Sequence, residues 1–230
     1  MENTLTAEQL EAIRRLDTCL VSNAIDTFNV RLRNEGFADA SIRCMFPHFP
    51  PLLGYAVTAR ISCSGPPPAG HSYFDRTDWW SYIATIPAPR VTVIQDIDEI
   101  PGVGGFVGEV HANVLRALNC AGTVTNGGVR DLPAVEQMGY QLFAGNVSVS
   151  HAYVHMIDFG GPVEVGGLTV RPGDLILGDC HGVLAIPRQI AAEIPAVAAR
   201  MVEKERRVIG LCRSPEFSLQ KLRTIIKELG

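Results

Sequence analysis

Residues 104–131 read GGFVGEVHANVLRALNCAGTVTNGGVRD, and this stretch decides the expected fold. After its glycine-rich start, apolar residues recur at the spacing of one helical face, at Val110, Val114, Leu115 and Leu118. We expect a short strand at 123–125 and then a turn at 126–128, because two glycines relax the backbone there. A further helix is expected at 132–138. This alternation of strand, glycine loop and helix indicates a layered α/β fold.

The rest of the chain extends this pattern on both sides. Near the N-terminus we expect helices within 6–30, the first opened by a capping box at Thr6 and the second beginning near Asp17 or Thr18. The other expected elements are strands at 51–63 and 91–97, a broken loop at 65–80, a tight hairpin at 163–170, strands at 175–177 and 183–186, and C-terminal helices within 188–230. We predict a single domain, 1–230, with its core at 50–187.

Two further segments carry expectations of their own. Trp79 and Trp80 end the broken loop, and we interpret them as partly buried against the body, with an interface or a lid as the alternative. Ser214 and Pro215 have the residue types of a helix cap and of a first helical position, so the last helix is expected to begin there.

Composition and charge exclude several classes of function. The chain has 20 Lys and Arg against 24 Asp and Glu and no basic run, so no nucleic-acid partner is expected. No stretch of 18 apolar residues occurs, and residues 1–9 are polar, so we expect no membrane span and a cytoplasmic location. The six cysteines are scattered without a CxxC pair, which is typical of reduced thiols.

The distribution of lysine constrains any carbonyl chemistry. All three lysines, Lys204, Lys221 and Lys227, lie near the C-terminus, so the first 203 residues contain none. A Schiff-base enzyme needs a desolvated lysine amine in its pocket. If this protein acts on carbonyl compounds, an arginine or a metal ion must polarise them.

Residues 104–131 also contain the strongest candidates for a functional site. The helix that begins near Glu109 leaves N–H groups without helical partners, which is typical of an anion site. Arg130 can grip a carboxylate with two hydrogen bonds, and Asp131 offers a hard oxygen ligand for a cation. Each residue also has a structural interpretation: Asp131 as a helix cap, Arg130 as a surface residue, and Glu109 as a partner of the helix dipole. From the residues alone, the prediction is an anion site near two helix starts.

This spacing resembles the signature of the RraA-like family, which includes 4-hydroxy-4-methyl-2-oxoglutarate aldolases. Gly105 is followed after three residues by Glu109, and twenty residues separate Glu109 from Arg130-Asp131. The run VRPGDLILGDCHGVLAIP at 170–187 resembles the family pattern as well. The resemblance implies an α/β/α layered sandwich related to the swivelling β/β/α domain. This sequence departs from the family pattern at two places. It has Glu109 as its first acidic residue, where the aldolases are similar in having Gly-Asp, and it has Asn126-Gly127 where Asp-Gly is common.

The resemblance also implies roles for individual positions. Arg130 would bind the carboxylate and the 2-oxo oxygen of the substrate. Asp131 would ligate a divalent cation, Mg²⁺ or Mn²⁺, and Glu109 would hold a water on that metal. The start of the helix would cradle the substrate carboxylate, at Gly108, Val110 and His111. Family members assemble as trimers with sites between subunits, which makes Glu203 or Glu205 a candidate contribution to a neighbouring site.

The reaction implied is metal-dependent cleavage of a small 2-oxo acid through a pyruvate enolate. It would be a retro-aldol reaction of the 4-hydroxy-4-methyl-2-oxoglutarate type, a decarboxylation of oxaloacetate, or both. The alternative is a non-catalytic protein of the RraA type that binds and regulates a ribonuclease. A methyltransferase is not indicated, because the glycine run at 102–105 lacks the position and the acidic strand of a nucleotide-binding motif.

The histidines are ambiguous at the level of sequence. His111 and His155 are hypotheses for proton transfer, although a single histidine is more often a structural residue. The roles of His151 and His181 stay open. His151 and His155 have i, i+4 spacing, but without an HExxH context they are poor evidence for zinc.

Overall fold

A nine-stranded mixed sheet organises the chain, which the computed structural model describes over residues 4–72 and 74–229. The helices are α1 (Ala7–Arg14), α2 (Thr18–Asp26), α3 (Thr77–Thr85), α4 (Glu109–Ala117), α5 (Leu132–Gln137), α6 (Ile194–Cys212) and α7 (Leu219–Leu229), with a 3-10 turn, η1 (Ala191–Glu193), before α6. The strands are β1 (Arg43–Cys44), β2 (Leu52–Ser62), β3 (Arg90–Asp96), β4 (Gly105–Val107), β5 (Cys120–Val129), β6 (Gln141–Val147), β7 (His155–Phe159), β8 (Val163–Val165), β9 (Leu168–Val170), β10 (Leu175–Asp179) and β11 (Gly182–Ile186).

The centre of the sheet is parallel. Its order is β1-β6-β5-β3-β2-β10-β11, with β4 beside β5 and β7 beside β2. The pairs β2–β3, β3–β5, β5–β6 and β4–β5 are parallel, and the outer pairs are antiparallel. The carboxyl ends of β3 and β5 therefore meet at one edge, which is where open α/β sheets bind ligands.

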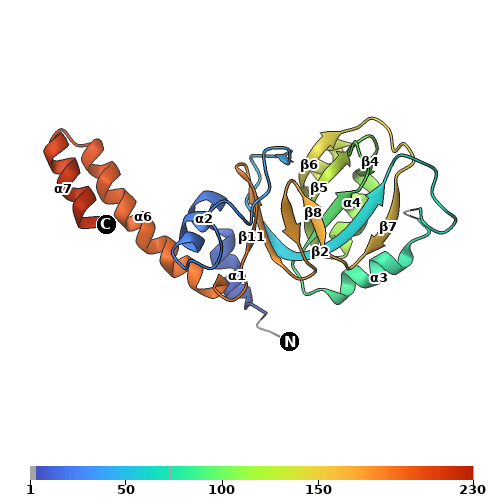
Figure 1. Cartoon of the computed structure of the whole chain (residues 1–230), viewed down its shortest axis with the longest axis horizontal. Coiled ribbons are helices and arrows are strands. Elements are labelled where there is room, and N and C mark those ends of the chain that lie inside the picture. Colours follow the sequence, from blue (N-terminus) through green and yellow to red (C-terminus); the bar gives the residue numbers. More distant parts are fainter. Residues whose placement is uncertain (1–3, 73, 230) are drawn as a thin grey trace.

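The two faces of the sheet are covered by different layers (Figure 1). Along β2, Val57 and Ile61 pack with α3, α4 and α5, and Leu53 packs with α1, α2 and α6. Leu52 and Ala56, at alternate positions, pack against the separate β8–β9 hairpin. Because side chains alternate along a strand, the hairpin covers one face and helices cover the other. The predicted α/β class is confirmed, with β/β/α layering around this strand.

Several local predictions are confirmed by hydrogen bonds. Thr6 and Gln9 form a reciprocal capping box at α1, and the Asp17 side chain accepts the Leu20 N–H at the start of α2. The predicted hairpin at 163–170 is present as β8 and β9. In each case the signal is a side chain or a turn that acts within a few residues.

The predicted turn at 126–128 is wrong, because these residues continue β5 to Val129. None of the three has a positive φ angle. Glycine is needed there for space instead: a Cβ at Gly128 would lie 2.6 Å from the Gly104 backbone oxygen. The neighbouring backbone of the loop before β4 therefore explains this glycine.

Two other boundaries differ from expectation. The segment 65–80 is not loop throughout, because α3 begins at Thr77, and Trp79 is fully buried while Trp80 is only partly exposed. The last helix begins at Leu219 rather than at Pro215, because Ser218 Oγ accepts the Lys221 N–H at 3.2 Å. Ser214 Oγ accepts the Glu216 N–H and forms only a local turn.

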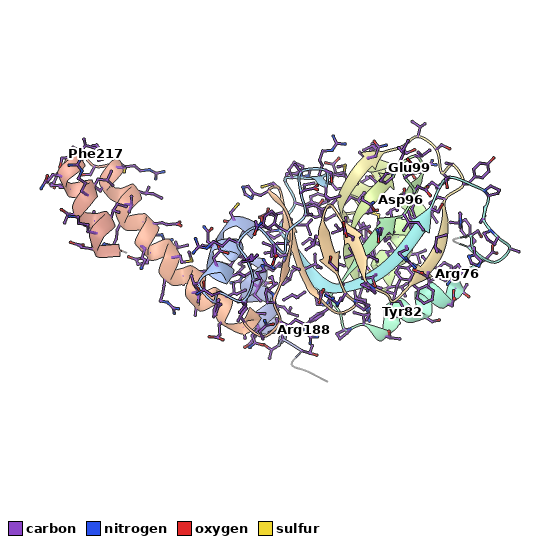
Figure 2. The ribbon with its side chains drawn as sticks, viewed as in Figure 1. Arg76, Tyr82, Asp96, Glu99, Arg188 and Phe217 are labelled. Atoms are coloured by element: carbon purple, nitrogen blue, oxygen red, sulfur yellow. The ribbon has the colours of Figure 1, made fainter. Side chains whose placement is uncertain are left out.

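The C-terminal helices form an arm that projects from the body (Figure 1). The buried residues of α6 are confined to its start, at Ile194, Val197 and Ala198. Helix α7 folds back along α6, and Phe217 marks the far tip of the arm, at the opposite end of the molecule from Asp96 (Figure 2). None of the helices in the described residues is long and apolar enough to cross a membrane.

Candidate functional site

The candidate site forms where β4 and β5 lead into α4 and α5. Two glycines create the space for its side chains: a Cβ at Gly108 would lie 2.4 Å from Asp131 Oδ2, and one at Gly105 would lie 3.2 Å from Arg130 Cγ. The Arg130 N–H donates to the Val107 carbonyl oxygen at 2.9 Å, which holds the two segments together. The glycine spacing seen in the sequence therefore reflects a close approach of two backbones.

Asp131 links two helices. It holds a left-handed backbone conformation, with φ of 55°, at the N-cap position of α5, but its side chain makes no cap hydrogen bond to that helix. Instead, Asp131 Oδ2 accepts the Glu109 N–H of α4 at 3.1 Å. The expected cap exists, but it serves the start of a different helix, whose own N-cap residue, Gly108, has no side chain.

Arg130 and Asp131 form an ion pair beside this helix start. Arg130 Nε donates to Asp131 Oδ1 at 3.1 Å, and the two side chains are 28% and 36% exposed. Burial alone would raise the pKa of Asp131, but the hydrogen bonds from Glu109 and Arg130 outweigh it and lower that pKa. Asp131 is therefore ionised at neutral pH, and both side chains keep enough exposure to bind a ligand.

A cavity of about 240 Å³ opens beside Asp131. Its wall combines loop, strand and helix residues: Ser72, Phe74, Phe106, Gly108, Val110, His111, Asp131, His151 and Val154. Asp131 also lines a more open hollow together with Arg130 and residues 147–149. The mostly apolar wall with a few polar groups is typical of a site for a small molecule.

The structure distinguishes the histidines. His111 is only 4% exposed, its Nδ1 lies 3.2 Å from the Phe106 carbonyl oxygen, and burial lowers its pKa from 6.5 to about 4. His111 is therefore a weak base at neutral pH, which disfavours the proton-transfer hypothesis for its side chain. His155 is buried, with Nδ1 2.8 Å from the Tyr153 oxygen. His151 lines the cavity beside Asp131, with Nδ1 2.8 Å from the Gly105 oxygen.

The fold brings most of the sequence-predicted site residues together. Gly108, Val110, His111 and Asp131 line the cavity, Arg130 adjoins it, and Glu109 is exposed at the first position of α4. Glu203 and Glu205 lie on α6, in the arm at the other end of the molecule (Figure 1). His151 and Phe106 were missed as site residues, because nothing in their local sequence relates them to Asp131.

Asp131 is the carboxylate of this site that could bind a divalent cation directly. Among the described residues, two groups of three potential ligands lie close together, and Asp131 belongs to neither. Its carboxylate has two hydrogen bonds and further lone pairs, so it can offer one direct ligand. Mg²⁺ keeps several waters and is often held by one or two carboxylates plus substrate, so these residues fit such an ion.

Comparisons with known proteins place the chain in a family. A family model described as RraA-like, Aldolase/RraA, matches residues 18–185. An uncharacterised protein of Methanocaldococcus jannaschii, MJ0644, is 29% identical over 163 residues, which cover 68% of this chain and 71% of that protein. A protein of Halalkalibacterium halodurans with the provisional name 4-hydroxy-4-methyl-2-oxoglutarate aldolase is 32% identical over 84 residues, 36% of this chain and 40% of that protein.

A solved structure shares the fold. Streptomyces coelicolor RraAS2, described as an unusual member of the family of RraA inhibitors of RNase ES, superposes with a TM-score of 0.70 at 19% identity. The superposition covers 89% of this chain and 96% of that one. With the family match over most of the sequence, these findings show that the chain belongs to the RraA-like family.

Proposed function

We propose that this protein is a divalent-metal-dependent lyase that cleaves a small 2-oxo acid, by retro-aldol cleavage, by decarboxylation of the oxaloacetate type, or by both. The observation that carries the proposal is the Arg130–Asp131 pair, which lies beside a cavity at the start of α4. The aldolase name of the Halalkalibacterium halodurans relative supports the same reaction class.

Each side chain of the site has a role that follows from its chemistry. The Arg130 guanidinium would bind the substrate carboxylate and stabilise the negative charge that develops on the 2-oxo oxygen during cleavage. The start of α4, from Gly108 to His111, would favour an anion through its helix dipole. Asp131 would hold Mg²⁺ or Mn²⁺, and that ion would supply Lewis-acid polarisation of the substrate. Glu109, exposed at the same helix start, would orient a water molecule.

The positions of the lysines favour this mechanism over a Schiff base. The first 203 residues contain no lysine, so the cavity has no amine from the body of its own chain. Lys204, Lys221 and Lys227 all lie on α6 and α7, in the projecting arm (Figure 1). Arg130 and a bound cation are therefore the electrophilic groups that we assign to this site.

Oxaloacetate decarboxylation tests the proposal. We expect turnover to disappear in EDTA, to return with Mg²⁺ or Mn²⁺, and to show no covalent adduct when borohydride is added with substrate. Turnover that persists fully in EDTA, or a protein–substrate adduct trapped by borohydride, would contradict a metal-dependent reaction without a Schiff base.

We also propose that the chain assembles as a homotrimer through its arm. Residues 200–230 carry eight Lys and Arg against four Asp and Glu, a net charge of +4, whereas the whole chain has a net charge of −4. The body is therefore strongly acidic at −8. The arm also exposes apolar side chains at Ile209, Phe217, Leu219 and Ile226. An arm that docks on a different surface of its neighbour forms a head-to-tail contact, and such contacts give a closed ring when the rotation between neighbouring chains closes, as it does in a trimer.

Light scattering tests the assembly. The wild-type protein should have a mass of about 75 kDa, three times the 24.9 kDa of one chain. A glutamate at Ile209, which is 46% exposed on the arm, should reduce the mass, whereas a glutamate at Leu32, which is 64% exposed on the body, should not. A stable 24.9 kDa wild-type monomer at micromolar concentration would refute the proposal.

A further inference from the structure

A second cluster of chemically reactive side chains lies far from the candidate site. Cys180 and His181 form the two-residue tip between β10 and β11, which pair from Leu175 opposite Ile186 to Asp179 opposite Gly182. Strand β10 runs beside the start of β2, where Gly178 is opposite Leu52. The candidate site lies beyond the other end of β2, ten residues along the strand, on the order of 30 Å away. The cluster is therefore independent of the proposed lyase site.

A buried carboxylate fixes the imidazole at this tip. Asp179 accepts the Thr18 N–H and hydroxyl at 2.8 and 2.7 Å, and the His181 N–H at 2.8 Å. His181 Nδ1 lies 3.1 Å from Asp179 Oδ1. Because an ionised carboxylate only accepts hydrogen bonds, Nδ1 donates to Asp179, and in the neutral imidazole with this tautomer the lone pair is on Nε2. A carboxylate that orients a histidine in this way is typical of a metal-ligating imidazole.

The thiol of Cys180 lies beside this imidazole. Cys180 Sγ is 3.6 Å from His181 Nδ1 and 4.0 Å from Nε2. In a tetrahedral zinc site, ligand sulfur and nitrogen atoms are about 3.5 Å apart, so a rotation of the exposed Cys180 side chain would bring Sγ to that distance from Nε2 while Asp179 holds the imidazole. One ligand atom from each of Asp179, Cys180 and His181 lies within 4.8 Å of the other two.

Cys19 completes the group from another element. It follows Thr18, the residue whose N–H and hydroxyl bind Asp179, and it lines a surface hollow of about 310 Å³ together with His181. The hydrogen bonds from Thr18 to Asp179 therefore hold the Cys19 backbone next to the tip, and Cys19 shares one hollow with His181. Three of the four side chains in this group are exposed: Cys19, Cys180 and His181.

We propose that Cys19, Cys180 and His181 form a binding site for a thiolate-preferring divalent cation, with Zn²⁺ as the expected ion. Two sulfurs and one imidazole suit zinc, whereas Mg²⁺ prefers oxygen ligands. The hollow lined by Cys19 and His181 leaves the fourth position of the ion open to solvent or to a small ligand. Asp179 stays outside the ligand set and orients His181.

Cobalt(II) titration of the full chain tests this site, because a thiolate–cobalt bond gives a charge-transfer band in the near ultraviolet that oxygen ligands do not give. The wild-type protein should develop the band with one equivalent of Co²⁺ and lose it when Zn²⁺ is added. Cys19→Ser, Cys180→Ser and His181→Gln should each weaken or abolish the band. Cys212→Ser is the matched control, because Cys212 is exposed at the end of α6.

The readout is independent of the proposed lyase activity, since Asp131→Asn should leave the cobalt band unchanged. Circular dichroism of each variant should show an intact fold, because the substituted side chains are exposed. A wild-type spectrum without the band overturns the site, as does a band that survives at full strength in any one of the three ligand variants.

Discussion

Asp131 and Asp179 make the same contact but sit in different surroundings. Each carboxylate accepts the N–H of the first residue of a helix that is distant in sequence: Glu109 of α4 for Asp131, at 3.1 Å, and Thr18 of α2 for Asp179, at 2.8 Å. In both, hydrogen bonds overcome the effect of burial and lower the pKa. The Asp179 side chain is 6% exposed, however, whereas that of Asp131 is 36% exposed.

The two carboxylates differ in how many hydrogen bonds they already accept. Asp179 receives four hydrogen bonds from Thr18 and His181, so its oxygens are occupied. Asp131 receives two, from Glu109 and Arg130, and borders a cavity. A saturated, buried carboxylate stabilises the fold, and a half-satisfied, exposed one can bind a ligand.

The largest expected effect belongs to Arg130, the partner of Asp131. Arg130→Ala removes the guanidinium that meets the developing charge, so kcat/KM for oxaloacetate should fall on the order of 10²–10³-fold. Lysine should restore little of it, because a point charge cannot reproduce the planar fork. Arg43→Ala, an exposed arginine on β1, is the control. Steady-state kinetics measure kcat/KM for each variant. Near-normal activity of Arg130→Ala would show that Arg130 has no role in the reaction.

Asp179 should affect stability more than any change at Asp131. Asp179→Ala leaves the buried groups of Thr18 without their partner, and we expect a loss of about 3 kcal/mol in the free energy of unfolding. Urea denaturation measures it. Asp174→Ala, which removes one turn hydrogen bond to the Arg171 N–H, should cost about 1 kcal/mol. Equal losses in the two variants would show that Asp179 is not a structural centre.

Because His111 is buried, we expect the free energy of unfolding to depend on pH. The pKa of His111 is about 4 in the folded chain, against the ordinary histidine value of 6.5, so the unfolded chain binds the proton first as the pH falls. The stability of the protein is therefore complete above pH 6.5 and declines by about 1.4 kcal/mol per unit toward pH 4. His111→Gln should flatten this slope. Denaturation midpoints at pH 5 and pH 7 check it, and an unchanged slope in the variant would contradict a neutral, buried His111.

The sequence predicted the contacts that are local. Thr6 and Asp17 cap helices within three residues, and the strand at 163–170 turns back on itself immediately. The predicted site also rests on spacing. Glu109 begins α4 and Arg130 directly follows β5, and because β4 and β5 pair in parallel, these two positions meet at one edge of the sheet.

Contacts between distant segments could not be read from the sequence. Gly128 looked like a turn residue because its reason for being glycine, the Gly104 backbone, belongs to another loop. Asp131 looked like a cap of its own helix because its partner, Glu109 N–H, is 22 residues away. His151 lies at the site because its ring contacts the Gly105 carbonyl oxygen, and the sequence around His151 gives no sign of that contact.

A smaller loss of stability is expected from Asp131→Ala. The substitution removes the hydrogen bond to the start of α4 and leaves alanine in a left-handed conformation, so the free energy of unfolding should fall by about 1–2 kcal/mol. Thermal denaturation measures this change. A loss as large as that of Asp179→Ala would show that Asp131 stabilises the fold as much as Asp179 does, and it would contradict the distinction between the two carboxylates.

Asp131→Asn tests the central claim most directly. Asparagine accepts the Glu109 N–H and tolerates the left-handed backbone, but its amide is a poor ligand for Mg²⁺. The measurement is Mg²⁺-dependent oxaloacetate turnover together with the melting temperature of the same preparation. We predict a melting temperature close to that of the wild type and no metal-dependent turnover. A variant that keeps near-normal turnover would show that Asp131 only caps α4 and that the metal site lies elsewhere.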